Sequence, residues 1–227
     1  MRRFVSLFLA LVILSMSIFT LSSCQRDREY DEAEVLSAAR ELIEKSVLLN
    51  EIYYGKGIPA TTDSSTANGY YFEADIRYLL ENDFKTVEDL KKMTAAVFTE
   101  DLCNLIFSTK LSSVIDEDNI QSMSRYYQKY YDAEGKKPEC IMVYTKAIDL
   151  LGESEILYDY TTLAVDGVKG EYVTVSIDAT VYNGKGDYQS ATLKIRMLEE
   201  ESGWRLDSPT YKVYSERLDE YEDLTKK

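Results

Sequence analysis

Two neighbouring stretches of this chain alternate strictly between apolar and polar residues, and this period of two restricts the fold more than any other feature. In residues 172–182 every odd-numbered position from Val173 to Val181 is apolar, whereas the even-numbered positions carry Thr, Ser, Asp or Tyr. Residues 190–197 alternate in the same way, and the sequence Asn-Gly-Lys-Gly-Asp at 183–187 separates the two stretches. The pattern predicts an antiparallel hairpin with one buried face and one wet face.

The first half of the chain has helical spacing instead. From Asp31 onward, apolar residues recur every three or four positions, and the glycines and proline within 55–59 end the pattern. Thr86, with Asp89 three residues later, predicts a capping box at the start of a second helix. Thr99 predicts the N-cap of a third helix.

Further strands are predicted mainly in the second half. They fall at residues 126–131, 140–145, 156–165 and 204–206. Residues 60–69 are mostly Thr, Ser, Asp, Ala and Asn, which predicts a loop. Helices followed by antiparallel strands predict an α+β domain whose N-terminal helices pack on one curved antiparallel sheet.

The N-terminus has the pattern of an export signal. Arg2 and Arg3 precede an apolar run at 4–20, and Leu21-Ser22-Ser23-Cys24 follows it. Those four residues resemble the lipobox of bacterial lipoproteins. The resemblance implies that Cys24 receives a diacylglycerol and becomes the mature N-terminus. The alternative is a leader left uncleaved as a membrane anchor.

Either interpretation places the rest of the chain on the extracytoplasmic face of a cell membrane. The expected organisation has four parts: a signal peptide at 1–23, a tether at 24–30, one α+β domain at 31–214, and an acidic tail or short helix at 215–227.

The charge of the exported part restricts its partners. Loss of Arg2 and Arg3 leaves 24 basic against 40 acidic side chains, a formal charge of −16. Nucleic acid is excluded, because binding to it depends on Lys and Arg neutralising phosphates. Anionic lipid headgroups are repelled too, so attachment to the membrane has to come from the lipid anchor. A basic envelope protein or a cell-wall component remains possible as a partner; the alternative is that the charge only keeps the domain soluble.

The chain contains no histidine, which removes Ser-His and Cys-His nucleophiles and His-bound zinc. Asp116, Asp118 and Asn119 cluster, but the glycine and the closing glutamate of a calcium loop are missing. We therefore expect neither a metal nor a cofactor. Export permits a disulfide between Cys103 and Cys140, but sequence alone does not decide whether the two meet.

One set of residues could still support catalysis in a pocket. Tyr172, Asp178 and Tyr182 share the polar face of one predicted strand. A carboxylate and phenols in an enclosed pocket are sufficient for isomerase chemistry. The alternative is that these residues form only the wet face of a half-buried sheet.

Tyrosines also occur as adjacent pairs on a predicted strand, at Tyr126-Tyr127 and Tyr130-Tyr131. Adjacent residues of a strand face opposite sides, so one ring of each pair should point inward and one outward. The outward rings could form a surface for a glycan or a protein. They could equally be covered by the stems of Lys and Arg.

Three segments resemble a family of exported lipoproteins from Gram-positive anaerobic bacteria. They are Asn-Glu-Ile-Tyr-Tyr-Gly-Lys-Gly-Ile-Pro at 50–59, the run at 84–99, and Trp-Arg-Leu-Asp-Ser-Pro-Thr-Tyr at 204–211. The resemblance implies an NTF2-like fold, a cystatin-like cone in which a curved sheet wraps around helices, and it implies no particular activity. Parts of the helical half resemble, more faintly, secreted inhibitors of peptidoglycan endopeptidases.

These observations lead to one expected function and two alternatives. We expect a lipid-anchored extracytoplasmic protein whose NTF2-like domain binds a ligand or a protein without catalysis. The first alternative is an inhibitor of cell-wall hydrolases, whose acidic surface would cover a basic cleft. The second is a small-molecule enzyme of the isomerase or dehydratase type that uses the cone pocket.

Overall fold

The structure is a computed structural model, and it describes residues 30–65, 69–112, 124–130, 134, 138–146, 156–182 and 187–211. Several of the expectations above concern residues outside these ranges. They are the signal peptide with Cys24, the possible calcium cluster, Tyr131, the side chain of Tyr182, and the tail at 215–227.

Helices dominate the first half of the described chain, as expected. The long helix α2 (Glu32–Tyr54) is followed by three shorter ones, α3 (Ile76–Glu81), α4 (Val87–Ala95) and α5 (Glu100–Lys110). The capping box of Thr86 and Asp89 is present at the start of α4, as predicted. Thr99 precedes α5, but its hydroxyl donates to Asp207 at 2.8 Å and makes no cap hydrogen bond.

Helix α2 begins and ends where its residues require. Asp31 caps it by accepting hydrogen bonds from the backbone N–H groups of Ala33 and Glu34. The apolar residues with helical spacing form its buried face, and the helix stops at Gly55. Three elements follow that the sequence did not predict: a strand at Ala60–Ser65 within the expected loop at 60–69, a second strand at Tyr71–Ala74, and helix α3.

The strands form two sheets, whereas one curved sheet was expected. The five-stranded sheet has the order β1-β2-β5-β4-β3 and the four-stranded sheet the order β6-β7-β8-β9. Their bounds are β1 Ala60–Ser65, β2 Tyr71–Ala74, β3 Leu111–Ser112, β4 Tyr126–Tyr130, β5 Pro138–Tyr144, β6 Ile156–Lys169, β7 Tyr172–Tyr182, β8 Tyr188–Glu200 and β9 Gly203–Leu206. All pairings are antiparallel except β3 with β4. The α+β class is confirmed, and the single sheet was wrong because alternation identifies a strand but not its partners.

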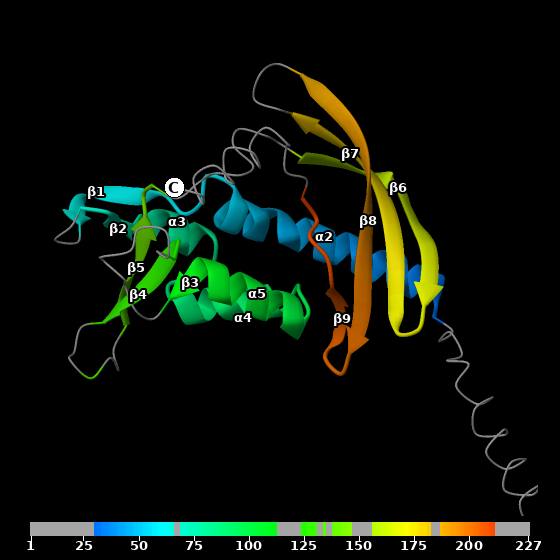
Figure 1. The fold of residues 1–227 in the computed structure, drawn as a ribbon, viewed down its shortest axis with the longest axis horizontal. Helices are drawn as coiled ribbons and strands as arrows, with labels where there is room; N and C mark the ends of the chain where they lie inside the picture. The colour runs from blue at the N-terminus through cyan, green and yellow to red at the C-terminus, as the bar shows by residue number, and fades with distance from the viewer. Residues whose placement is uncertain are drawn as a thin grey trace, which may run out of the picture.

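The hairpin predicted from the alternating stretches is confirmed in detail. Strands β7 and β8 pair along their whole length, from Tyr172 opposite Leu198 to Tyr182 opposite Tyr188. The odd-numbered side chains of β7 are buried, and those of Val173, Val175 and Ile177 belong to the same apolar core as α2, which contacts β6 and β9 of this sheet. Figure 1 shows α2 extending from the four-stranded sheet toward the five-stranded sheet, with α4 and α5 beside it.

The C-terminal end of α2 is closed by side chains from the start of β4. Arg125, only 6% exposed, donates hydrogen bonds to the carbonyl groups of Tyr53, at 3.1 Å, and Gly55. The hydroxyl of Tyr126 donates to the carbonyl of Ile52 at 2.7 Å. The last carbonyl groups of a helix have no partner within it, so these donors supply what the helix lacks.

A buried polar network joins α2 to the segment after β9. The hydroxyl of Thr210, fully buried, lies 2.6 Å from that of Ser46 and accepts from the Asn50 amide at 2.8 Å. Beside it, the rings of Tyr54 and Tyr211 stack with centroids 4.3 Å apart. The network therefore joins the segment at 50–59 to the segment at 204–211.

We predict that Thr210→Val will destabilise the domain by about 1–3 kcal/mol, because the amide of Asn50 and the hydroxyl of Ser46 would be buried without this partner. Urea unfolding followed by the fluorescence of Trp204, the single tryptophan, measures the change. The matched control is Thr180→Val on the wet face of β7, with an expected effect within about 0.5 kcal/mol. Equal losses in the two variants would contradict the prediction.

Candidate functional site

The outer face of the four-stranded sheet is polar and open to solvent. Ser190, Thr192, Lys194 and Arg196 are exposed along β8, and Asp178 is exposed beside them on β7. Helix α2 packs on the opposite face of this sheet. The sheet therefore presents one side to the core and leaves the other available for contact with another molecule.

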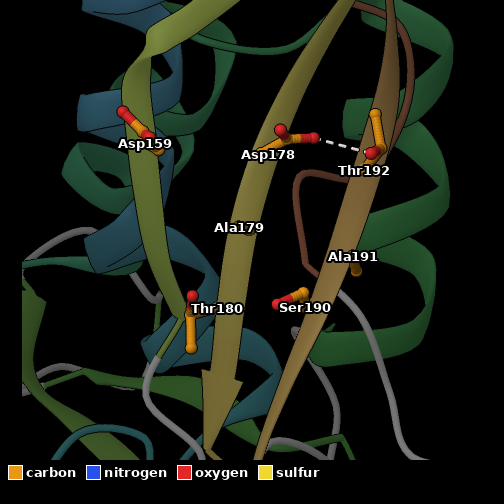
Figure 2. Close-up of a pocket in the computed structure, with 7 residues that line it drawn as sticks. All are labelled: Asp159, Asp178, Ala179, Thr180, Ser190, Ala191 and Thr192. Atoms are coloured by element: carbon orange, nitrogen blue, oxygen red, sulfur yellow. Dashed lines mark hydrogen bonds between the residues drawn. The ribbon is translucent and has the colours of Figure 1, made fainter.

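A hollow of about 370 Å³ lies on this outer face, where β6, β7 and β8 run side by side (Figure 2). Its lining consists of oxygen-bearing side chains and two alanines: Asp159, Asp178, Ala179, Thr180, Ser190, Ala191 and Thr192. Ligand sites in proteins commonly enclose roughly 300 to 1,000 Å³. The hollow is thus near the lower end of that range.

Two carboxylates line the hollow from neighbouring strands, because Asp159 of β6 pairs directly with Asp178 of β7. Figure 2 shows the Asp178 carboxylate turned toward Thr192 of β8 and the Asp159 carboxylate turned away from β7. Oδ1 of Asp159 accepts hydrogen bonds from Thr161, at 2.6 Å from its hydroxyl and at 3.0 Å from its backbone N–H. These two bonds hold the pKa of Asp159 below its usual value. Oδ1 of Asp178 accepts from the hydroxyl of Thr192 at 2.6 Å (Figure 2). One oxygen of each carboxylate is thus fixed by the protein.

A bulge in β6 creates this arrangement. The register of β6 against β7 shifts between Asp159 and Ala164, so the chain carries extra residues there. The hydroxyl of Thr162 fills the gap: it accepts from the backbone N–H of Asp178 at 2.9 Å and donates to the carbonyl of Asp159 at 2.8 Å. The bulge thereby completes the backbone hydrogen bonding beside the hollow.

The sequence identified one residue of this site, Asp178, and missed the others. The register of the hairpin could have identified the hydroxyls, because antiparallel pairing of β7 with β8 places Thr180 opposite Ser190 and Asp178 opposite Thr192. Asp159 gives a weaker signal, an Asp followed two residues later by Thr, which is typical of a local side-chain turn.

The structure does not bring Tyr172 to Asp178. The two share a face of β7 but are six residues apart, about 20 Å along an extended strand. The ring of Tyr172 instead lies under the guanidinium of Arg196, at 4.9 Å from its centroid. Tyr182 pairs through its backbone with Tyr188, and its side chain lies outside the description. The hollow is therefore lined by Asp178 but not by Tyr172.

Of the paired tyrosines that were expected to form a binding surface, three are described by the structure, and one of these three is exposed. Tyr126 is fully buried, and Tyr127 is buried in a separate cluster with Tyr71, Met142 and Tyr144. Only Tyr130 is exposed, by 44%. The reason is that both faces of the five-stranded sheet are covered at this point, so the inward and the outward ring of the first pair are both buried. Tyr131 lies outside the described residues.

Comparison with known proteins adds no relative. No protein-family model, curated protein or solved structure matches this chain. Cys103 and Cys140 are both free thiols. Within the described ranges, no three His, Cys, Asp or Glu side chains gather closely enough to hold a metal. In the same part of the chain, every helix is too short or too polar to cross a bilayer.

A second group with unusual surroundings lies at the end of α5. The amine of Lys110 sits 5.0 Å from the centre of the Tyr54 ring. Leu111 pairs with Tyr126, which places Lys110 near Arg125. Burial, and then the charge of Arg125, lower the pKa of Lys110 to about 8. In the unfolded chain the pKa is about 10.4.

We predict that Lys110→Met will remove a pH-dependent penalty on stability. Between about pH 8 and pH 9 the unfolded chain binds more protons at Lys110 than the folded protein, so the free energy of unfolding contributed by this residue rises with pH. From about pH 8 upward Cys103 and Cys140 act in the opposite direction, because burial raises the pKa of each thiol to about 11. Both proteins carry these thiols, so their effect cancels in the comparison. In urea unfolding at pH 7, 8 and 9 the free energy of unfolding of the wild type should therefore gain on that of the variant as the pH rises, and parallel curves would contradict the prediction.

Proposed function

We propose that this protein is an exported lipoprotein, anchored through Cys24 at the extracytoplasmic face of the cell membrane, whose domain binds a partner and catalyses no reaction. The observation that carries the binding role is the open polar face of the four-stranded sheet with its hollow between β6, β7 and β8. The resemblance of Leu21-Ser22-Ser23-Cys24 to a lipobox supports the proposed lipid anchor.

The composition of the hollow supports binding over catalysis. Its carboxylates and hydroxyls can accept and donate hydrogen bonds, but no thiol or amine lines it, and the chain has no histidine to activate a hydroxyl. Asp178 is open to solvent, whereas pocket isomerases depend on an enclosed, desolvated acid. The NTF2-like assignment belongs to the same proposal, and a long helix on the inner face of a twisted antiparallel sheet supports it.

The position of Tyr30 indicates how the domain would be oriented relative to the membrane. Its ring packs edge-on against Trp204, with centroids 5.1 Å apart, and its hydroxyl donates to the carbonyl of Glu171 at 3.1 Å. Tyr30 is the sixth residue after Cys24, so the two are at most about 22 Å apart. Asp178 lies seven residues beyond Glu171 along β7, roughly 23 Å away. The hollow would therefore lie at a distance from the point of attachment.

The anchor can be tested by metabolic labelling with a fatty-acid analogue. Cys24→Ala should lose the label and be released from the membrane fraction, because the thiol that receives the diacylglycerol is absent. Cys140→Ala is the control and should keep both the label and the location. Equal label on Cys24→Ala and the wild type would exclude the lipoprotein assignment.

The binding face can be tested by affinity capture from a crosslinked envelope fraction with the full-length protein. Thr192→Arg places a cation in the hollow and should reduce capture of the partner at least tenfold. Asn104→Arg, on the exposed side of α5, changes the charge equally and should not affect capture. Equal capture by all three proteins would refute this face as the binding site. Recovery of a basic enzyme of the cell wall would favour the alternative of a hydrolase inhibitor.

A further inference from the structure

We infer that the hollow is a carbohydrate subsite, which binds a sugar residue of a neutral or amino-bearing polysaccharide. The inference rests on the proposed binding role of the outer face and names the class of ligand. It depends on three features: the charge of the lining, the oxygen atoms that point to solvent, and two exposed apolar side chains at the border.

The charge of the lining excludes anionic ligands. Asp159 and Asp178 are the charged residues that line the hollow, and both are acidic. The cations nearby on the outer face are already paired: Lys194 bonds to Asp166 at 3.0 Å, and Arg196 bonds to Asp207 at 2.7 Å. Phosphates, acidic sugars and carboxylate ligands would meet repulsion without a compensating partner.

Several oxygen atoms of the hollow are available to a ligand. Within the described part of the chain, Oδ2 of Asp159 and Oδ2 of Asp178 accept no hydrogen bond from the protein. The hydroxyls of Thr180 and Ser190, which are directly opposite each other, have no protein partner there either. Sugars present several hydroxyls in fixed positions, and hydrogen bonds from a hydroxyl to a carboxylate are among the stronger ones. The fixed Oδ1 atoms keep the acceptors oriented before the ligand arrives.

Apolar surface borders the hollow on two sides. Leu157 of β6 is 50% exposed and pairs with Thr180. Tyr188 of β8 is 65% exposed and lies two residues before Ser190, on the same face. Sugar rings combine polar edges with apolar C–H faces, and an exposed tyrosine ring suits such a face. A polysaccharide crossing the strands could contact both residues.

Other small ligands fit less well. Calcium requires six to eight oxygen ligands, and the hollow offers two carboxylates whose inner oxygens are already occupied. A mainly apolar molecule would find apolar side chains only at the border, on Leu157 and Tyr188, because Ala179 is buried on the inner face of the sheet and Ala191 pairs with it. Carbohydrate is therefore the class that uses all of the available groups.

The test measures binding of three carbohydrate probes, two hexasaccharides and one anionic polymer, to the full-length protein, purified from membranes in detergent, by isothermal titration calorimetry. The probes are a neutral β-1,4-glucan, a β-1,4-linked glucosamine oligomer, and polygalacturonate as the anionic control. We expect binding of the neutral or the amino-bearing probe and none of polygalacturonate. Asp178→Asn and Tyr188→Ala should each weaken binding at least tenfold. Asp101→Asn, an equal charge change on the exposed side of α5, should leave binding unchanged.

Unfolding curves followed by Trp204 fluorescence establish that the variants remain folded. The inference is overturned if neither of the first two probes binds, if polygalacturonate binds as well as they do, or if Asp178→Asn and Tyr188→Ala bind like the wild type. Calcium binding that depends on Asp178 would also overturn it. If Thr192→Arg abolishes envelope capture while no sugar binds, the binding role of the face stands and only the ligand class is wrong.

Discussion

A long helix ends in carbonyl groups that it cannot satisfy, and the way this chain satisfies them at the end of α2 determines much of the rest of the structure. Arg125 and Tyr126, from the start of β4, reach these carbonyls. Gly57 allows this approach, because its φ is +81° and an added Cβ would lie 2.5 Å from Arg125 Nη2 and Tyr126 Oη. The five-stranded sheet is thus fixed to the helix through backbone groups as well as through apolar packing.

The same helix fixes the second sheet by a different means, the buried hydroxyls and amide around Thr210. The three sequence segments at 50–59, 84–99 and 204–211 therefore meet one another, since Tyr53 of the first also bonds to Thr94 of the second at 2.8 Å. Their contacts are structural. They hold the helix and the sheets together, whereas the hollow on the outer face uses none of these residues.

Local patterns predicted the elements well and their assembly less well. The alternation that begins at Val173 and the capping box at Thr86 each depend on residues close in sequence, and both were confirmed. Strand β1 has no apolar alternation and forms because β2 offers it a partner, so composition predicted a loop there. The pairing of Asp159 with Asp178 lies beside a bulge in β6. A bulge shifts the strand register without leaving a periodic pattern in the sequence, so the alternation of apolar residues could not predict it.

Strand β6 lies at the edge of its sheet and is 14 residues long. An uninterrupted edge of this length would offer a template for strands of neighbouring molecules. Its register against β7 shifts twice, at Asp159–Ala164 and at Val165–Gly167. At the first shift the hydroxyls of Thr161 and Thr162 donate hydrogen bonds to the carboxylate and the carbonyl of Asp159. A lipid anchor would confine many copies to two dimensions and raise their local concentration. The irregular edge would then keep crowded neighbours from joining into a continuous sheet.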